Sequence, residues 1–184
     1  MRLFAAIPMN GAVQDALSAL LMRYRKTDWP VKWVRSEGLH ITVKFLGSVE
    51  AERTGAIADA LADASAGTPA LPFTLREVGA FPGFARARVL WAGLESETAL
   101  ELLVDRVERR CAALGFAVEG RPFRPHVTLG RLRDGARLPT AAIHELEREI
   151  PSGSCVADRL VLFESVPGSG GSTYTPRATF PLGA

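Results

Sequence analysis

Cysteine, histidine and lysine are scarce in this chain of 184 residues. There are two cysteines and three histidines, and the only lysines are Lys26, Lys32 and Lys44. The two cysteines, Cys111 and Cys155, are both expected to be small core residues, and nothing suggests a disulfide framework. No His, Cys or carboxylate residues cluster with the spacing of a metal site, so no metal and no cofactor is expected.

Long apolar segments are also missing. The chain has no apolar run near the ~18 residues that cross a bilayer. Its first apolar stretch, residues 3–7, is too short for a signal peptide. Residues 168–172 are glycine-rich, but a predicted strand follows them, so they lack the helix N-terminus of a phosphate-binding loop. We therefore expect a cytoplasmic protein with no membrane segment.

The overall composition is that of an ordinary globular domain. Hydrophobic residues make up 47% of the chain and charged residues 23%, and the net charge of +2 neither favours nor excludes nucleic acid as a partner. A chain of this length fits one domain, so residues 1–184 are expected to form a single domain made of two lobes, and to be monomeric.

A four-residue pattern occurs twice: His40-Ile-Thr-Val43 and His126-Val-Thr-Leu129. Successive side chains of a β-strand point to opposite faces, so each copy presents His and Thr on one face and buries its aliphatics on the other. A single His-x-Thr on a strand is usually unremarkable. Two copies in similar frames predict one paired site with two imidazoles and two hydroxyls.

Hydrophobic periodicity predicts helices and strands that are interleaved along the chain. Several strands follow each other across short turns, which favours an α+β fold with largely antiparallel sheets flanked by helices. The position of the motifs, one in each half, suggests two lobes related by a pseudo-twofold axis, with the active-site cleft between them. The predicted helices are 10–24, 51–64, 100–114 and 140–150, and the predicted strands are 3–7, 31–34, 39–46, 73–78, 88–91, 126–131, 159–165 and 173–180, with a further strand that begins at Cys155.

The two motifs and their flanks resemble the two-histidine phosphoesterases, and more closely the RNA 2′,3′-cyclic phosphodiesterases, also called 2′-5′ RNA ligases. The resemblance rests on the segments His40-Ile-Thr-Val-Lys-Phe-Leu-Gly47 and Arg124-Pro-His-Val-Thr-Leu129 and extends to most of the chain, including Gly79-Ala-Phe-Pro82, Arg88-Val-Leu-Trp91 and Tyr174-Thr-Pro176.

The resemblance implies a bilobal fold and hydrolysis of RNA 2′,3′-cyclic phosphate ends to 2′-phosphates, with possible reversible 2′-5′ ligation. It implies His40 as the proton donor and His126 as the proton acceptor, and it makes Thr42 and Thr128 the hydroxyls that bind phosphate. The partners are then RNA ends or nucleotides that carry a 2′,3′-cyclic phosphate.

Residues near the motifs are harder to assign. Arg131 could bind phosphate, but strict alternation puts it on the face opposite His126 unless the strand bulges. Lys44 shares the His40 face by the same alternation and is expected to be a solvated residue. Phe81, Phe84 and Trp33 could stack on a base, although core packing is the simpler expectation for each. The third histidine, His144, is expected on the exposed side of a helix.

Three alternatives remain open. The same chemistry could act on another substrate, such as a cyclic phosphate of ADP-ribose or a 2′-5′-linked oligonucleotide. The chain could bind cyclic phosphate ends of RNA without cleaving them. His40 and His126 could instead be metal ligands.

Overall fold

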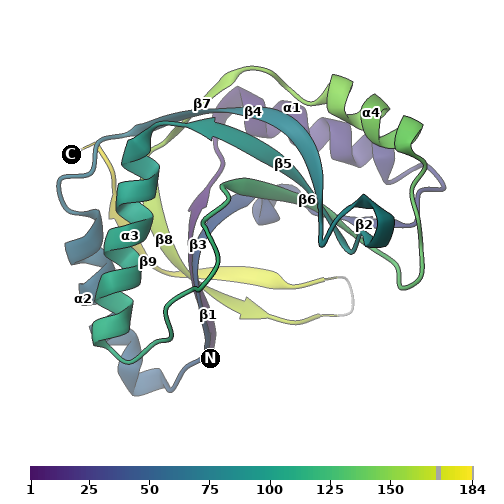
Figure 1. Cartoon of the computed structure of the whole chain (residues 1–184). Coiled ribbons are helices and arrows are strands. Elements are labelled where there is room, and N and C mark those ends of the chain that lie inside the picture. Colours follow the sequence, from purple (N-terminus) through teal and green to yellow (C-terminus); the bar gives the residue numbers. More distant parts are fainter. Residues whose placement is uncertain (169–170, 184) are drawn as a thin grey trace.

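The computed structural model describes residues 1–168 and 171–183 (Figure 1). Within these residues one sheet contains nine strands, and all the pairings are antiparallel. The strands are β1 (Arg2–Pro8), β2 (Val31–Trp33), β3 (His40–Ser48), β4 (Leu71–Phe81), β5 (Val89–Ser96), β6 (His126–Leu132), β7 (Ser154–Ala157), β8 (Arg159–Val166) and β9 (Thr173–Pro181). The helices are α1 (Gly11–Tyr24), α2 (Thr54–Ser65), α3 (Thr98–Ala113) and α4 (Thr140–Glu149).

The sheet is arranged symmetrically about its two motif strands. The strand order is β7-β4-β5-β6-β3-β1-β8-β9, and β2 also pairs with β6. The two central strands meet through the pair Ile41–Val127, in which each residue follows a motif histidine. Three strands continue from β6 on one side and three from β3 on the other, so the approximate twofold axis passes between Ile41 and Val127.

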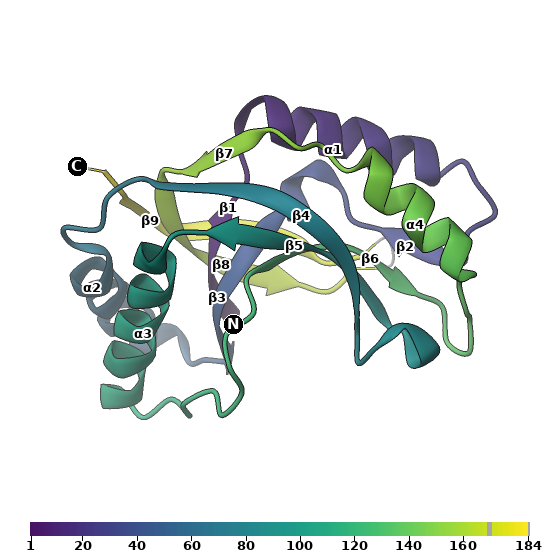
Figure 2. The same cartoon turned by 45° about the horizontal axis from the view of Figure 1, so that its top comes forward.

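Each half of the sheet has its own pair of helices. Helices α2 and α3 pack against each other, and they contact β9 and β3. Helices α1 and α4 contact β2, β7 and β4. Figure 2 shows the two helix pairs at opposite ends of the molecule. We call β1, β3, β8, β9, α2 and α3 the His40 lobe, and β2, β4 to β7, α1 and α4 the His126 lobe.

Amphipathic sequence explains why these helices cover the sheet. The buried residues of α3 recur at helical spacing, and Gly115, with φ of 84°, follows its end. The buried residues of α3 are Leu100, Leu103, Val104, Val107 and Cys111.

The antiparallel α+β fold with two lobes is confirmed. The two lobes share one continuous sheet, which is curled and has a concave side (Figure 1).

Both motif strands contain a bulge at the same position, the last residue of the motif. In β3, Ala6 pairs with Thr42 and Ala5 with Lys44, so Val43 is the extra residue. In β6, Trp91 pairs with Thr128 and Leu90 with Gly130, so Leu129 is extra. Each bulge reverses the alternation of faces beyond it.

The bulges change which face the following residues occupy. Phe45 and Arg131, five residues after each motif histidine, return to the face of the motif histidines, whereas Lys44 and Gly130 turn toward the core. The prediction that Lys44 is solvated on the His40 face is therefore wrong. Arg131 lies on the His126 face because β6 bulges at Leu129, the condition under which the sequence allowed this position.

Other predicted elements differ at their ends. Strands β4 and β5 are longer than the predicted 73–78 and 88–91: β4 is extended at both ends, and β5 begins at Val89 and continues to Ser96, with buried residues such as Leu71 and Ala92 in the added parts. The strand expected from Cys155 is β7, which begins one residue earlier. The predicted helix 51–64 begins with a 3-10 turn over Ala51–Arg53. Across the described ranges, no helix is both long and apolar enough to span a membrane.

Candidate active site

The register of β3 and β6 brings the four motif residues to one place. Extending the antiparallel pair Ile41–Val127 by one residue in each direction places His40 opposite Thr128 and Thr42 opposite His126. The aliphatic partners Ile41 and Val127 are fully buried on the other face. Diagonal neighbours in such a pair lie roughly 7–8 Å apart, which leaves room for a small group between the two imidazoles.

His40 is packed among aromatic side chains of its own lobe. The centroid of its ring lies 5.1 Å from that of Phe4 and 6.3 Å from that of Phe163. The Tyr174 ring stands perpendicular to it at 5.3 Å. Burial among these rings, together with the positive charge that His126 can carry, lowers the pKa of His40 to about 4. His40 is therefore neutral at pH 7 in the unliganded protein.

His126 has fewer aromatic neighbours and one fixed hydrogen bond. Its ring lies 5.0 Å from Phe81 and 5.9 Å from Trp91 between centroids. A carbonyl can only accept, so His126 Nδ1 donates to the Arg124 carbonyl oxygen at 2.7 Å, and the neutral ring keeps the Nε2 lone pair free. Burial lowers the pKa of His126, and the hydrogen bond to Arg124 opposes that shift.

The Trp91 ring can lie flat on the sheet because its partner strand has no side chain beneath it. A Cβ atom on Gly79, which pairs with Trp91, would stand 2.0 Å from the indole. Any other residue at this position would therefore displace the ring from His126.

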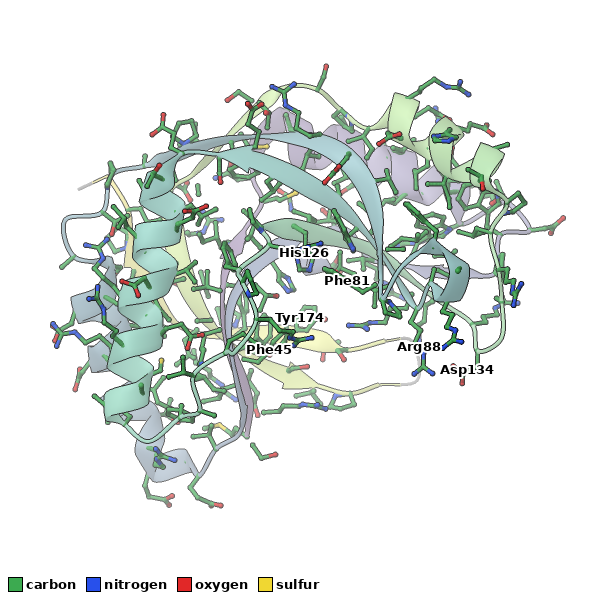
Figure 3. All side chains as sticks on the ribbon, in the orientation of Figure 1. Phe45, Phe81, Arg88, His126, Asp134 and Tyr174 are labelled. Atoms are coloured by element: carbon green, nitrogen blue, oxygen red, sulfur yellow. The ribbon has the colours of Figure 1, made fainter. Side chains whose placement is uncertain are left out.

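Beyond the motifs, the two lobes present different chemistry on this face. In the His40 lobe, Phe45 is 74% exposed and pairs with Phe4. At the matching position of the His126 lobe, Arg131 is exposed and lies between Lys32 of β2 and Val89 of β5. In Figure 3, His126 and Phe81 lie above Phe45 and Tyr174 on the concave side of the sheet.

Several residues considered from the sequence lie outside this face. Lys44 is buried, and its Nζ contacts Glu108 Oε2 and the Ala117 carbonyl oxygen, each at 2.6 Å. His144 is exposed on α4, as predicted, with Nδ1 3.6 Å from Glu147. Trp33 is a core residue, as expected, whereas Phe84 is 48% exposed, so the expectation of core packing is wrong for Phe84.

Among the described residues, the imidazoles have no carboxylate or thiol neighbours that would complete a metal site. Nowhere in residues 1–168 and 171–183 do three His, Cys, Asp or Glu side chains gather closely enough to hold a metal ion.

The sequence did not point to Phe45 or Tyr174 as residues of this face. Strict alternation from His40 places Phe45 in the core, and the bulge at Val43 that exposes it leaves no clear sequence signal. Tyr174 reaches His40 through the β8–β9 hairpin, which a local pattern cannot pair with β1 and β3. A signal did exist for Trp91, because glycines at 79 and 93 leave space for a large ring.

Comparison with known proteins places this geometry in a family. The family described as the 2′-5′ RNA ligase superfamily matches residues 13–168. A relative from Aeropyrum pernix, named RNA 2′,3′-cyclic phosphodiesterase, is 35% identical over 152 residues, which cover 80% of this chain and 84% of the relative. Relatives from other bacteria and archaea have the same name.

Solved structures agree with the family match. The crystal structure of TT0787 of Thermus thermophilus superposes with a TM-score of 0.80 and 25% identity, covering 99% of this chain and 98% of that one. Escherichia coli LigT in complex with 3′-AMP superposes with a TM-score of 0.74 and 25% identity, covering 98% and 97%. The chain therefore belongs to the 2′-5′ RNA ligase superfamily.

Proposed function

We propose that this chain hydrolyses RNA 2′,3′-cyclic phosphate ends to 2′-phosphates by acid–base catalysis with His40 and His126 and without a metal. The observation that carries the proposal is the register at Ile41–Val127, which faces each histidine with the threonine of the other motif. A phosphate held between the imidazoles would have one ring on each side, as in-line displacement at phosphorus requires.

In this mechanism His126 is the proton acceptor. Its Nδ1–H is held by the Arg124 carbonyl, so Nε2 can take a proton from the attacking water. The water oxygen forms a new bond to phosphorus, and the bond between phosphorus and the 3′-oxygen breaks. His40 donates the proton that this oxygen needs, and the product is a 2′-phosphate with a free 3′-hydroxyl.

The proton on His40 depends on the substrate. In the unliganded protein the pKa of His40 is lowered to about 4, so the ring is neutral near pH 7. A phosphate anion beside the ring favours the imidazolium form and raises this pKa. Substrate binding therefore places the proton where the leaving oxygen will need it.

The remaining residues of the face divide the substrate between the two lobes. Thr42 and Thr128 donate hydrogen bonds to the non-bridging oxygens and stabilise charge that builds up in the transition state. Arg131 contributes a fixed positive charge for phosphate on the His126 side. Phe45 offers an exposed ring on which the terminal base can stack.

The relatives support this substrate class. The curated relatives are named RNA 2′,3′-cyclic phosphodiesterases, and E. coli LigT has been crystallised with 3′-AMP. Reversal of the reaction, with a 5′-hydroxyl in place of water, would join RNA ends by a 2′-5′ bond. We also propose that residues 1–184 act as one domain, because each lobe supplies half of the site and the lobes share a sheet.

A substrate panel under exhaustive chelation tests the proposal. The panel contains adenosine 2′,3′-cyclic phosphate, an RNA ending in the same group, a cyclic phosphate of ADP-ribose and a 2′-5′-linked dinucleotide. We expect turnover of the RNA end to a 2′-phosphate, undiminished by the chelator. Preference for another substrate of the panel would leave the two-histidine chemistry in place but would change the proposed substrate. Binding without turnover would indicate a binder, and loss of activity on chelation would indicate a metal enzyme.

A further inference from the structure

Positive charge is concentrated at one end of the His126 lobe. Residues 84–88 and 131–137 together contain five arginines and one acid, Asp134, although the net charge of the whole chain is only +2. All five arginines are exposed. We call this set the arginine rim: Arg86, Arg88, Arg131, Arg133 and Arg137.

The two segments are held together by the backbone of the sheet. Leu132 N donates to the Arg88 carbonyl oxygen at 3.0 Å, and Val89 pairs with Arg131. Arg133 N donates to the Pro30 carbonyl oxygen at 2.9 Å, which joins the strand bearing Lys32 to the same edge. These contacts fix the backbone of the rim at Arg88, Arg131 and Arg133. Figure 3 shows Arg88 and Asp134 at this end of the curled sheet.

The rim arginines differ from several arginines elsewhere in the chain, whose charge is offset by a carboxylate. Arg23, Arg76 and Arg177 each form an ion pair with a carboxylate. In the part of the chain that the structure describes, none of the five rim guanidinium groups forms such a pair. A cluster of exposed arginines at the edge of a sheet is suited to bind a polyanion. A single strand of RNA is such a polyanion, with phosphates at regular intervals.

The rim continues directly from the active site. Arg131 follows Thr128 on the same strand, roughly 7–10 Å further along, and Arg133 lies roughly 7 Å beyond it. The matching stretch of the His40 lobe presents the exposed ring of Phe45, and its exposed arginine, Arg2, pairs with Ser48 at the far end of β3. A strand of RNA that leaves the site is therefore attracted more strongly toward the His126 lobe.

We propose that the arginine rim binds the RNA strand on the 5′ side of the cyclic end, so that the preferred substrate is an oligonucleotide and not a mononucleotide. This proposal rests on the proposed function, because the cyclic end fixes where the strand begins. The terminal base lies against the aromatic side of the site, and the preceding phosphates cross the β5–β6 edge toward Arg88 and Arg133.

The test compares two substrates and two double variants. The substrates are adenosine 2′,3′-cyclic phosphate and an RNA tetranucleotide ending in that group. The rim variant is Arg88→Gln with Arg133→Gln, which leaves Arg131 in place. The matched control is Arg2→Gln with Arg148→Gln, which removes two exposed arginines away from the rim.

We expect kcat/KM of the wild type to be higher for the tetranucleotide. The rim variant should lose about tenfold of kcat/KM on the tetranucleotide and change less than about twofold on the mononucleotide, because only the longer substrate reaches the rim. The control variant should match the wild type on both. Equal effects of the rim variant on both substrates, or none on either, would overturn the proposal.

Binding provides an arm that does not need turnover. The Kd of a 5′-labelled tetranucleotide with a 2′-phosphate end is measured against salt by fluorescence anisotropy. Loss of two phosphate contacts should reduce the slope of log Kd against log salt by about 1.4, at about 0.7 for each contact on a single strand. Asp134→Asn should tighten binding. If the proposed function is wrong, neither substrate is turned over, but the rim variant still shows the reduced slope. If the slope is the same in the rim variant and the wild type, the proposal that the rim binds RNA is rejected.

Discussion

The two motif histidines occupy matching positions of the sheet, yet their surroundings differ. His40 is enclosed by three aromatic rings, and its pKa is lowered to about 4. His126 contacts two rings and keeps a hydrogen bond to the Arg124 carbonyl oxygen that favours its protonated form. A symmetric backbone therefore carries two chemically different imidazoles.

This difference shows how an almost symmetric site can assign different roles to its halves. His126 is oriented in one tautomer before the substrate arrives, as a base should be. His40 has no proton to give near pH 7 until an anion binds beside it. In this proposal His126 is ready before the substrate binds, whereas His40 gains its proton when the substrate binds. The role of each histidine can be tested separately.

The largest effect is expected from removing either histidine. His40→Ala and His126→Ala should each lower kcat by on the order of 10²–10⁴-fold, the usual contribution of a general acid or base. The double variant should be only slightly worse than either single variant, because the two groups act as one unit. Steady-state turnover of a cyclic-ended RNA measures all three.

The chain supplies its own control for this experiment. His144→Ala removes an exposed histidine on α4 and should leave kcat unchanged. Far-ultraviolet circular dichroism should show that all variants remain folded. A His126→Ala enzyme that retains activity would exclude the paired mechanism.

A substrate with a good leaving group should separate the two roles. A nitrophenyl phosphodiester needs little protonation of its leaving oxygen, so His40→Ala should retain most of the wild-type rate on it. His126→Ala should stay impaired, because the attacking water still lacks its base. The opposite pattern, with His126→Ala the more active variant, would exchange the two roles.

Smaller losses are expected at the threonines. Thr42→Ala and Thr128→Ala should each lower kcat by on the order of tenfold to a thousandfold, the range for one donor to a developing oxyanion. Thr→Ser at either position should restore most of the rate, since the hydroxyl is kept. Serine variants as poor as the alanine variants would show that the hydroxyls are not the active groups.

The smallest change should be a shift in pH dependence. The pH profile of kcat/KM follows the pKa values of the free enzyme, and the reacting complex needs His40 protonated and His126 neutral. With the pKa of His40 at about 4 and that of His126 also lowered, the optimum should lie on the acid side of pH 6.5. Above the optimum the rate falls as His40 loses its proton, and below it the rate falls as His126 gains one.

Tyr174→Ala sharpens this comparison. It opens His40 to water, which should raise the pKa of His40 and move the optimum to higher pH. Phe81→Ala should act in the same way on His126. Profiles of kcat/KM between pH 4 and 8 measure both shifts. An optimum that stays in place in Tyr174→Ala would mean that burial by this ring does not set the acidity of His40.

Local patterns in the sequence were enough to predict the strands that carry the motifs. His40 and Thr42, like His126 and Thr128, share a face because a strand alternates, and burial of Ile41 and Val127 sets that face. The assignment failed one residue beyond the first motif, at Lys44, where a bulge reverses the alternation. Each bulge arises from the register with a neighbouring strand, β1 or β5. That register cannot be predicted from the local sequence, because the paired strands are distant in the chain.

The symmetry of the two lobes was predicted, but the segments of the chain that form each lobe were not. The sequence halves show no repeat because neither lobe is one half of the chain. The His40 lobe takes β1 and β3 from before residue 50 and β8 and β9 from after residue 158, while the His126 lobe takes most of its strands from between them. Only tertiary pairing reveals this interleaving.

The interleaved topology also has a consequence for synthesis of the protein. All the strands of the His126 lobe, β2 and β4 to β7, have been made once residue 157 has left the ribosome. β1 must still wait for β8, which is made later, to complete the sheet around His40. These contacts join residues far apart in sequence, which makes their formation slow. A nascent chain thus acquires His126 in a nearly complete lobe before His40 has its aromatic enclosure, and the RNA chemistry proposed here must wait for the last hairpin.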